Sequence, residues 1–225
     1  MLVLAIDTSG KQGSIALARA QESEDDIEVI EVATLVGGTF SAQLVPQIAA
    51  LLSSHGLGKH DLGALAVASG PGSFTGLRVG LAAVKALAEV LRIPIAAVPL
   101  LEVCAVGRGT QGKVMAVLDA GRGEVYTGEY EIPRTEGQLP RESICTRSEF
   151  LARAQGWNVV TPDAALAEAA RSVGLSAAAL PPLSAANVAQ LGWRKLRLGQ
   201  TVAPAELEAN YIRRIDAEMV EKVRS

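Results

Sequence analysis

The feature of this sequence that most constrains its fold is a motif that occurs twice. An apolar run, Leu4-Ala5-Ile6-Asp7, ends in aspartate and leads into Gly10-Lys11-Gln12-Gly13, and Val117-Leu118-Asp119 leads in the same way into Gly121-Arg122-Gly123. An apolar run of this length is typical of a buried strand, and glycine-rich segments after it favour a tight hairpin turn. Because each half of the chain begins with the same strand and hairpin, we expect two lobes of related fold.

The order of predicted elements repeats in the same way. Strands are expected at 2–7, 13–20, 27–36, 63–69 and 95–98, and helices over 41–54 and from the loop near residue 73 to Arg92. The second half is expected to hold strands at 113–119, 123–131, 142–146 and 158–161. Its predicted helices are one opened by Ser148 and two near 163–172 and 184–198. The sequence therefore predicts an α/β protein.

The duplicated βββαβα order resembles the two-lobe, actin-like ATPase fold, whose sheets are of the ribonuclease H-like kind. We expect an N-terminal lobe of residues 1–103 and a C-terminal lobe of residues 104–204. The C-terminal segment, about 205–225, could pack back on the first lobe. If the lobes face each other, Asp7 and Asp119 lie on opposite walls of one cleft and are candidate nucleotide or anion contacts. The alternative is that each aspartate only accepts hydrogen bonds from the backbone of its own hairpin.

A glycine-rich loop, Gly70-Pro71-Gly72-Ser73-Phe74-Thr75-Gly76, joins a predicted strand to a long apolar helix. Ser73 and Thr75 are both suitable N-caps, and a helix N-terminus presents free N–H groups that can bind an anion. Ser73 and Thr75 are therefore further candidate anion contacts. The loop matches neither the Walker pattern nor the dinucleotide-binding pattern. A purely structural turn explains its glycines equally well.

The helix that follows this loop is apolar around most of its circumference. Arg78, Lys85, Glu89 and Arg92 fall on one narrow stripe, whereas packing on a sheet needs an apolar arc of only about 100°. One apolar flank can face the sheet, and the other needs a second cover. That cover is either the helix at 41–54 or a protein partner. The residues predicted to form a partner interface are Gly76, Val79, Gly80, Ala83, Ala86 and Val90.

Composition narrows the class of protein. With 225 residues, 49% of them hydrophobic, the chain can bury a large core, and its net charge of −3 argues against a principal role in binding nucleic acid. Charged residues interrupt the apolar tract at 79–106, so no membrane span is expected. The N-terminus lacks a basic signal-peptide region. Cys104 and Cys145 fit unpaired thiols, and we expect a cytoplasmic protein.

Four blocks of the sequence are similar to the TsaB family, also called YeaZ, of bacterial tRNA threonylcarbamoyladenosine biosynthesis. They are residues 4–9, the glycine loop at 70–80, Asp119-Ala120-Gly121-Arg122-Gly123-Glu124-Val125-Tyr126, and Asn210-Tyr211-Ile212-Arg213-Arg214. The resemblance spans nearly the whole chain. One departure is Phe40-Ser41-Ala42, where the family often has His-Ser-Glu before the leucine, and a partner or ligand contact there would be altered.

The resemblance implies a non-catalytic partner of the related subunit TsaD. The pair would recruit the ATPase TsaE and transfer a threonylcarbamoyl group to adenosine 37 of tRNAs that read ANN codons. ATP and metal are then expected at the partner subunits, with no cofactor or metal assigned here. The chain would meet tRNA only through the complex. From the second apolar flank of the helix at 76–92, we expect the chain alone to form a homodimer built around that helix and the helix at 41–54. In TsaD a metal-binding His-Met-Glu-Gly-His segment follows the corresponding strand. Here Leu100 and Cys104 occupy the two histidine positions.

Two enzyme classes remain as alternatives. An ATP-dependent small-molecule kinase of the same fold would use Asp7 and Asp119 around a magnesium nucleotide. Against it, Leu180-Pro181-Pro182-Leu183 stands where an adenosine-binding Gly-Gly motif is expected. A metallopeptidase lacks ligands, because the only histidines, His55 and His60, are predicted to be ordinary surface residues. Sequence alone leaves open nucleotide binding, the stoichiometry of a complex and direct tRNA contacts.

Overall fold

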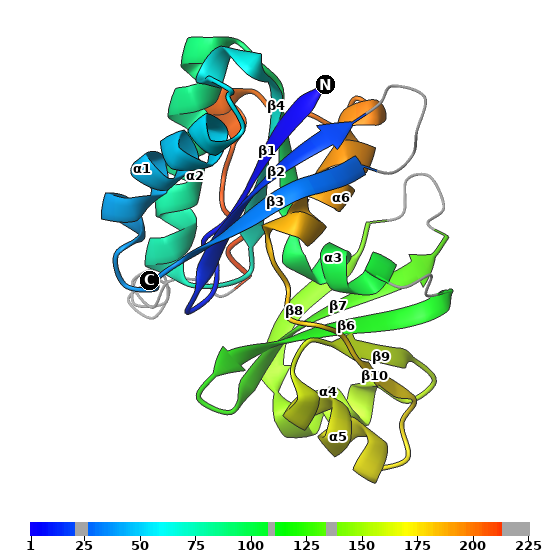
Figure 1. Ribbon diagram of the computed structural model, residues 1–225. Helices are drawn as coiled ribbons and strands as arrows, with labels where there is room; N and C mark the ends of the chain where they lie inside the picture. The colour runs from blue at the N-terminus through cyan, green and yellow to red at the C-terminus, as the bar shows by residue number, and fades with distance from the viewer. Residues whose placement is uncertain (21–26, 108–110, 134–138, 213–225) are drawn as a thin grey trace, which may run out of the picture. The chain divides into compact units, whose positions relative to one another are not determined.

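The computed structural model describes residues 1–20, 27–107, 111–133 and 139–212. The chain forms two compact units (Figure 1). Among the described residues, one consists of Met1–Val103 and Leu183–Ala209, and the other of Cys104–Pro182 and residues 210–212.

The first unit is built on a five-stranded sheet of order β3-β2-β1-β4-β5. Its strands are β1 (Leu2–Asp7), β2 (Gly13–Ala20), β3 (Ile27–Leu35), β4 (Leu62–Gly70) and β5 (Ile95–Pro99). The pairs β1–β2 and β2–β3 are antiparallel, whereas β1–β4 and β4–β5 are parallel. Helices cover both faces, which explains why β1 and β4 are almost continuously apolar.

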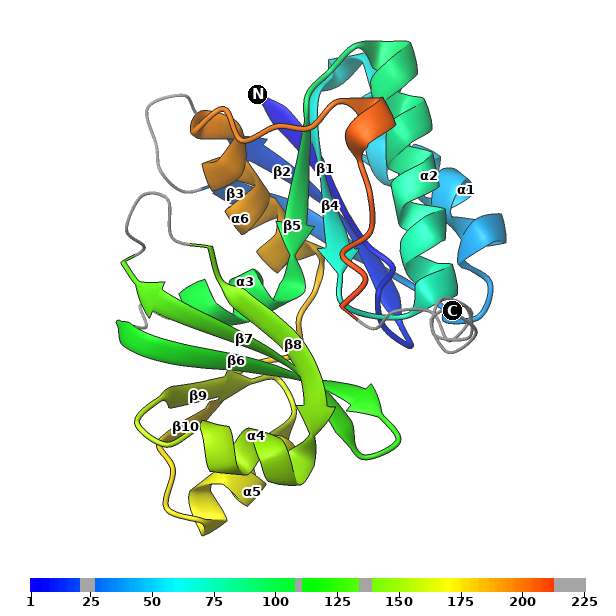
Figure 2. The ribbon, with the colours of Figure 1, turned by 180° about the vertical axis from the view of Figure 1, so that it is seen from behind.

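Three long helices provide that cover. Helices α1 (Phe40–Ser54) and α2 (Phe74–Leu91) lie on one face of the sheet and α6 (Ala185–Arg197) on the other (Figures 1 and 2). Leu77, Leu81 and Val84 of α2 are buried against the sheet together with Leu44 and Ile48 of α1. The periodicity that predicted these two helices therefore also predicted the faces that enter the core.

Helix α6 corrects the predicted division of the chain. The sequence analysis placed 184–198 in the C-terminal lobe, but this helix packs on β1, β2, β4 and β5 of the first unit. The contact is close at Gly192, where a Cβ would lie 2.5 Å from the Cβ of Ala66. The chain then continues through a short 3-10 turn, Pro204–Glu206, to Leu207, which is 1% exposed in the core of the same unit. Residues 213–225 of the predicted C-terminal segment lie outside the described residues.

The second unit repeats the sheet of the first, in the order β10-β9-β6-β7-β8. Its strands are β6 (Gly112–Gly121), β7 (Glu124–Ile132), β8 (Arg141–Thr146), β9 (Asn158–Thr161) and β10 (Ala177–Ala179). Strands β6, β7 and β8 are antiparallel neighbours, and β6, β9 and β10 are parallel, as in the first unit. Helices α4 (Arg147–Arg153) and α5 (Ala164–Ser172) pack on this sheet around Met115 and Phe150.

Three details differ from the predicted elements. Helix α4 is capped by Thr146 and not by Ser148. The sequence analysis missed β10 and also α3 (Leu100–Val106), a short helix directly after β5. Helix α3 carries the segment compared above with the metal-binding segment of TsaD.

Candidate functional site

Asp7, the first candidate anion contact, is buried at the end of β1. Its Oδ1 accepts hydrogen bonds from the backbone N–H of Ser9 at 2.9 Å and from the Ser9 hydroxyl at 2.6 Å. Burial raises the pKa of the Asp7 carboxyl above its ordinary value, and the two hydrogen bonds from Ser9 oppose that rise. Asp7 thus closes the turn after β1, as the structural alternative predicted.

Ser73 is the N-cap of α2, and its backbone N–H and its hydroxyl oxygen both form hydrogen bonds within the first unit. Its backbone N–H donates to the carbonyl oxygen of Ser9 at 2.7 Å, and its hydroxyl oxygen accepts a hydrogen bond from the N–H of Gly76 at 3.2 Å. The start of α2 is therefore joined to the turn after β1. Two of the N–H groups expected to bind an anion already have partners inside the protein, and Thr75 is exposed beside them.

The glycines of the loop allow this close approach. An added Cβ would lie 2.6 Å from the carbonyl oxygen of Ser9 at Gly72, 2.0 Å from the carbonyl oxygen of Thr8 at Gly76, and 2.5 Å from the Thr8 hydroxyl at Gly80. Gly76 and Gly80 were predicted to face a partner. Because both are buried against Thr8, they do not belong to the partner surface.

Asp119, the remaining candidate, lies in the second unit and has a different environment. Its Oδ1 accepts a hydrogen bond from Nη2 of Arg147 at 3.1 Å, and both side chains are about half exposed. An exposed ion pair of this kind contributes only about 0–1 kcal/mol to stability. The two aspartates that are alike in sequence therefore differ in burial and in partners.

The second flank of α2, which the sequence left without a cover, is covered only in part. Helix α1 lies beside α2, and between them runs a groove of about 450 Å³. Val79 and Ala83 are half-buried along this groove, Ala86 is exposed, and Val90 is 67% exposed. The groove is lined by Ser41, Leu44, Val45, Phe74, Thr75, Arg78, Val79, Ala82 and Ala83.

Helix α1 contributes an uncharged surface to the same face. None of its 15 residues is charged, and Val45 is 65% exposed. A helix without a charged residue is itself a signal of a covered face. The segment that departs from the family pattern, Phe40-Ser41-Ala42, lies at the start of this helix. Phe40 is a core residue next to Gly13, whereas Ser41 lines the groove. We call the exposed side of α1 and α2, including the groove, the α1/α2 face.

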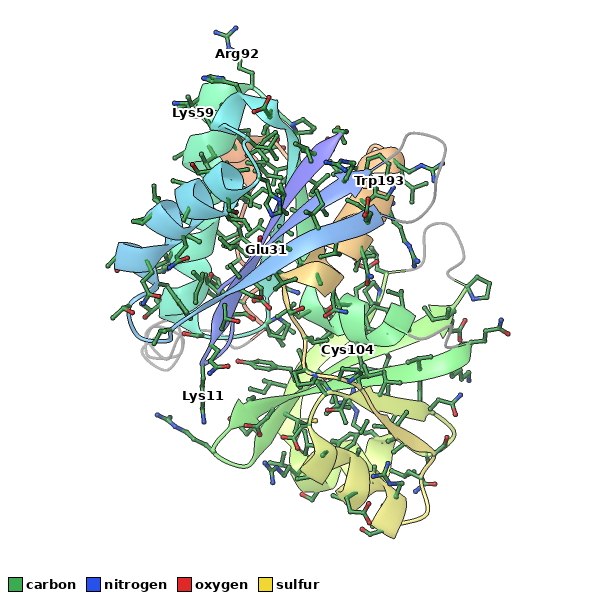
Figure 3. All side chains as sticks on the ribbon, in the orientation of Figure 1. Lys11, Glu31, Lys59, Arg92, Cys104 and Trp193 are labelled. Carbon is green, nitrogen blue, oxygen red and sulfur yellow. The ribbon has the colours of Figure 1, made fainter. Side chains whose placement is uncertain are left out.

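The segment on α3 has no metal-binding character. Leu100 and Cys104 are both buried, and burial raises the pKa of the Cys104 thiol to about 12, so it stays protonated at neutral pH. Figure 3 labels Cys104 on α3. Glu102 forms an ion pair with Nζ of Lys195 on α6 at 2.9 Å, and the two side chains are 11% and 13% exposed. No cluster of three or more metal-ligating side chains occurs among the described residues.

The two histidines lie at the end of α1 and in the 3-10 turn that follows it, Lys59–Asp61. His55 lies just after α1, and its Nε2 is 2.7 Å from a carboxylate oxygen of Glu31 on β3. His60 is exposed.

Within the described ranges, no helix is both long enough and apolar enough to cross a membrane.

The two sheets, with identical strand order and pairing, define a duplicated actin-like, ribonuclease H-like α/β protein, as predicted. The fold matches YeaZ from Pseudomonas aeruginosa with a TM-score of 0.69 and 24% identity, covering 93% of this chain and 99% of that one. The family model described as TsaD, tRNA N6-adenosine threonylcarbamoyltransferase, matches residues 32–192. The chain therefore belongs to the TsaD family, in its TsaB (YeaZ) group.

Two relatives that are named TsaB agree with this placement in the family, and a third relative is similar over nearly its whole length. The TsaB protein of Bacillus subtilis, named as a tRNA threonylcarbamoyladenosine biosynthesis protein, is 41% identical over 58% of this chain, and the match spans only 56% of that relative. TsaB of Escherichia coli is 29% identical over 95% of both chains. An uncharacterized protein of Mycobacterium tuberculosis is 32% identical over 96% of this chain and 93% of its own length.

Proposed function

We propose that this chain is the non-catalytic partner of a TsaD protein in the complex that forms N6-threonylcarbamoyladenosine at position 37 of tRNAs reading ANN codons. In this proposal the chain binds TsaD directly and helps to recruit the ATPase TsaE. It meets tRNA only within the assembly, in the cytoplasm where tRNA is modified. Membership of the TsaB group supports the pathway, and the role within it is argued from the structure.

The observation that carries the proposal is the α1/α2 face. It combines an uncharged helix, a groove of about 450 Å³ and exposed apolar side chains on both helices, with Val45 and Val90 each about two-thirds exposed. A largely apolar groove beside exposed apolar side chains is typical of a protein interface, whereas a catalytic site usually gathers polar groups. A partner helix in the groove would bury Val79 and Ala83 completely and provide the missing cover for α2.

The chemistry of the other candidates supports a partner role over catalysis. Asp7 is buried, and its Oδ1 already accepts hydrogen bonds from the backbone N–H and the hydroxyl of Ser9. The thiol of Cys104 is fully buried, and burial raises its pKa to about 12, so it is poorly suited to act as a nucleophile. We assign ATP and metal to the partner subunits for these reasons. The kinase alternative gains no support from the surroundings of Asp7.

The test is reconstitution with the TsaD and TsaE proteins of the same organism. We expect tRNA modification and ATP turnover only when all three proteins are present, and none above background from this chain alone. The variants Asp7→Asn and Asp119→Asn should retain activity in the complete mixture. ATP turnover by the isolated chain that either variant abolishes would instead establish the kinase alternative.

A further inference from the structure

The hairpin between β6 and β7 has an unusual backbone. Gly121, Arg122 and Gly123 are three consecutive residues in the left-handed region, with φ of 73°, 54° and 82°. Glycine and asparagine adopt this conformation readily, and they dominate at such hairpin positions. An arginine there carries a steric cost because its Cβ crowds the backbone. Arg122 is therefore a residue that the turn itself disfavours.

No hydrogen bond or ion pair of the Arg122 side chain within the described residues offsets this steric cost. The side chain is exposed, and it forms no hydrogen bond or ion pair with any residue in the described part of the chain. Asp119, three residues earlier, pairs with Arg147 instead. The hairpin extends past the end of β9 in both views (Figures 1 and 2), so its tip is accessible. An exposed cation kept at a strained position points to a contact outside the chain.

Only one other residue of the described chain that is not glycine has a positive φ, and it has an ordinary explanation. Arg92, with φ of 57°, follows α2, and its N–H donates to the carbonyl oxygen of Ala88. This is the usual left-handed end of a helix, where a positive side chain also interacts favourably with the helix dipole. Arg92 thus has a structural reason for its position that Arg122 lacks.

The charges around the hairpin indicate the chemistry of the contact. Glu124 pairs in register with Thr146, and Thr146 in turn binds the carboxylate of Glu149, so two acidic side chains flank the hairpin. The charge of Asp119 is already balanced by Arg147, whose backbone N–H donates to the carbonyl oxygen of Gly123. The carboxylates of Glu124 and Glu149 disfavour the binding of a polyanion such as tRNA beside Arg122. A single carboxylate on a protein surface suits an isolated arginine, whose planar fork can donate two parallel hydrogen bonds to it.

We propose that Arg122 is a contact residue that donates hydrogen bonds to a carboxylate on a protein subunit of the threonylcarbamoylation complex. The contact is made by the second unit and is separate from the α1/α2 face. This inference depends on the proposed function, because that function supplies the partner proteins, TsaD and TsaE.

The test compares stability with affinity for Arg122→Gly and Arg122→Lys. Arg122→Gly relieves the backbone cost, so the melting temperature of the isolated chain should rise by about 2–4 °C. Arg92→Gly is the matched control for this gain in stability at a left-handed arginine.

Calorimetric titrations then measure binding of the chain to TsaD, and binding of TsaE to the preformed pair. In one of these, Arg122→Gly should weaken affinity by roughly tenfold to a hundredfold, the value of a charge-assisted hydrogen bond. Arg122→Lys should recover part of the lost affinity.

The outcomes separate this inference from the proposed function. A more stable Arg122→Gly variant that binds both proteins as tightly as the wild type overturns the contact and leaves the proposed function intact. A loss confined to tRNA binding by the complete complex also overturns it, in favour of a phosphate contact. If the wild-type chain binds neither protein, the proposed function fails and this inference fails with it.

Discussion

The hydroxyl of Thr8 donates a 2.7 Å hydrogen bond to the carbonyl oxygen of Gly76, 68 residues further along the chain. A Cβ on Gly76 would lie 2.0 Å from the carbonyl oxygen of Thr8, so the backbones of the two residues are also in close contact. This pair fixes the first turn of α2 against the end of β1. The glycine loop thus has a packing role in the first unit.

We expect Gly76→Ala to destabilise the protein by about 2–4 kcal/mol, because the new methyl group overlaps backbone that cannot move independently. Gly58→Ala is a suitable control, since the Cβ there would meet only a side-chain oxygen of Asp61 at 3.8 Å. Urea unfolding of both variants measures the difference. Equal stability of the two variants would show that Thr8 and Gly76 are not in close contact.

The raised pKa of Asp7 predicts a pH dependence. Because the native carboxyl binds its proton more tightly than the unfolded one, its contribution to stability is fully present below the ordinary value of 3.8 and is lost as pH rises through the folded pKa. Asp7→Asn keeps an oxygen that can accept from Ser9 but does not titrate. The variant should therefore gain stability relative to the wild type as pH rises from about 3 to 8. A difference that stays constant with pH would contradict the burial of this carboxyl.

The ion pair between Glu102 and Lys195 joins α3 to α6. Lys195→Met removes the cation that forms this nearly buried ion pair with Glu102, which should cost about 3–5 kcal/mol. The double variant Lys195→Met with Glu102→Leu should recover most of that loss, because no buried charge remains. Unfolding free energies of the four proteins in this double-mutant cycle test the prediction. Similar losses for the single and the double variant would mean that the pair is not effectively buried.

The apolar α1/α2 face predicts self-association when no partner is present. We expect a homodimer in isolation, and Ala86→Glu should convert it to a monomer because a charge would be buried in the interface. Ala86 is exposed, so the fold should be kept. Ala165→Glu, at an exposed position of α5 in the second unit, is the matched control. Light scattering reports the mass of each variant, and a dimeric Ala86→Glu protein would place the interface elsewhere.

Local pattern was sufficient to predict much of the fold. The repeated strand and hairpin motif, with apolar periodicity, predicted the helices α1 and α2 and every described strand of the two sheets except β10. It could not place α6, because periodicity identifies an amphipathic helix without showing which of two sheets it will cover. Gly192 decides that placement through its contact with Ala66, and the contact is visible only in three dimensions. Helix α3 was missed since its seven residues are too few for a periodic signal.

The candidate site was predicted less completely. Residue type identified Ala86 and Val90 as exposed positions of α2, whereas Val79 and Ala83 are partly buried and also pack against the core. It failed for Gly76 and Gly80, because a small residue favours close approach to a partner and to the protein's own backbone equally. Spacing could not distinguish the buried Asp7 from the exposed Asp119, whose difference arises from neighbours distant in the sequence.

The central claim is that the α1/α2 face binds a TsaD protein, and calorimetric titration of the TsaD from the same organism tests it most directly. The wild type and Ala165→Glu should bind with equal affinity, and Ala86→Glu should bind at least a hundredfold more weakly, as expected for an unpaired charge that costs about 3 kcal/mol or more. Circular dichroism should show that all three proteins are folded. A folded Ala86→Glu variant that binds TsaD as tightly as the wild type would contradict the account.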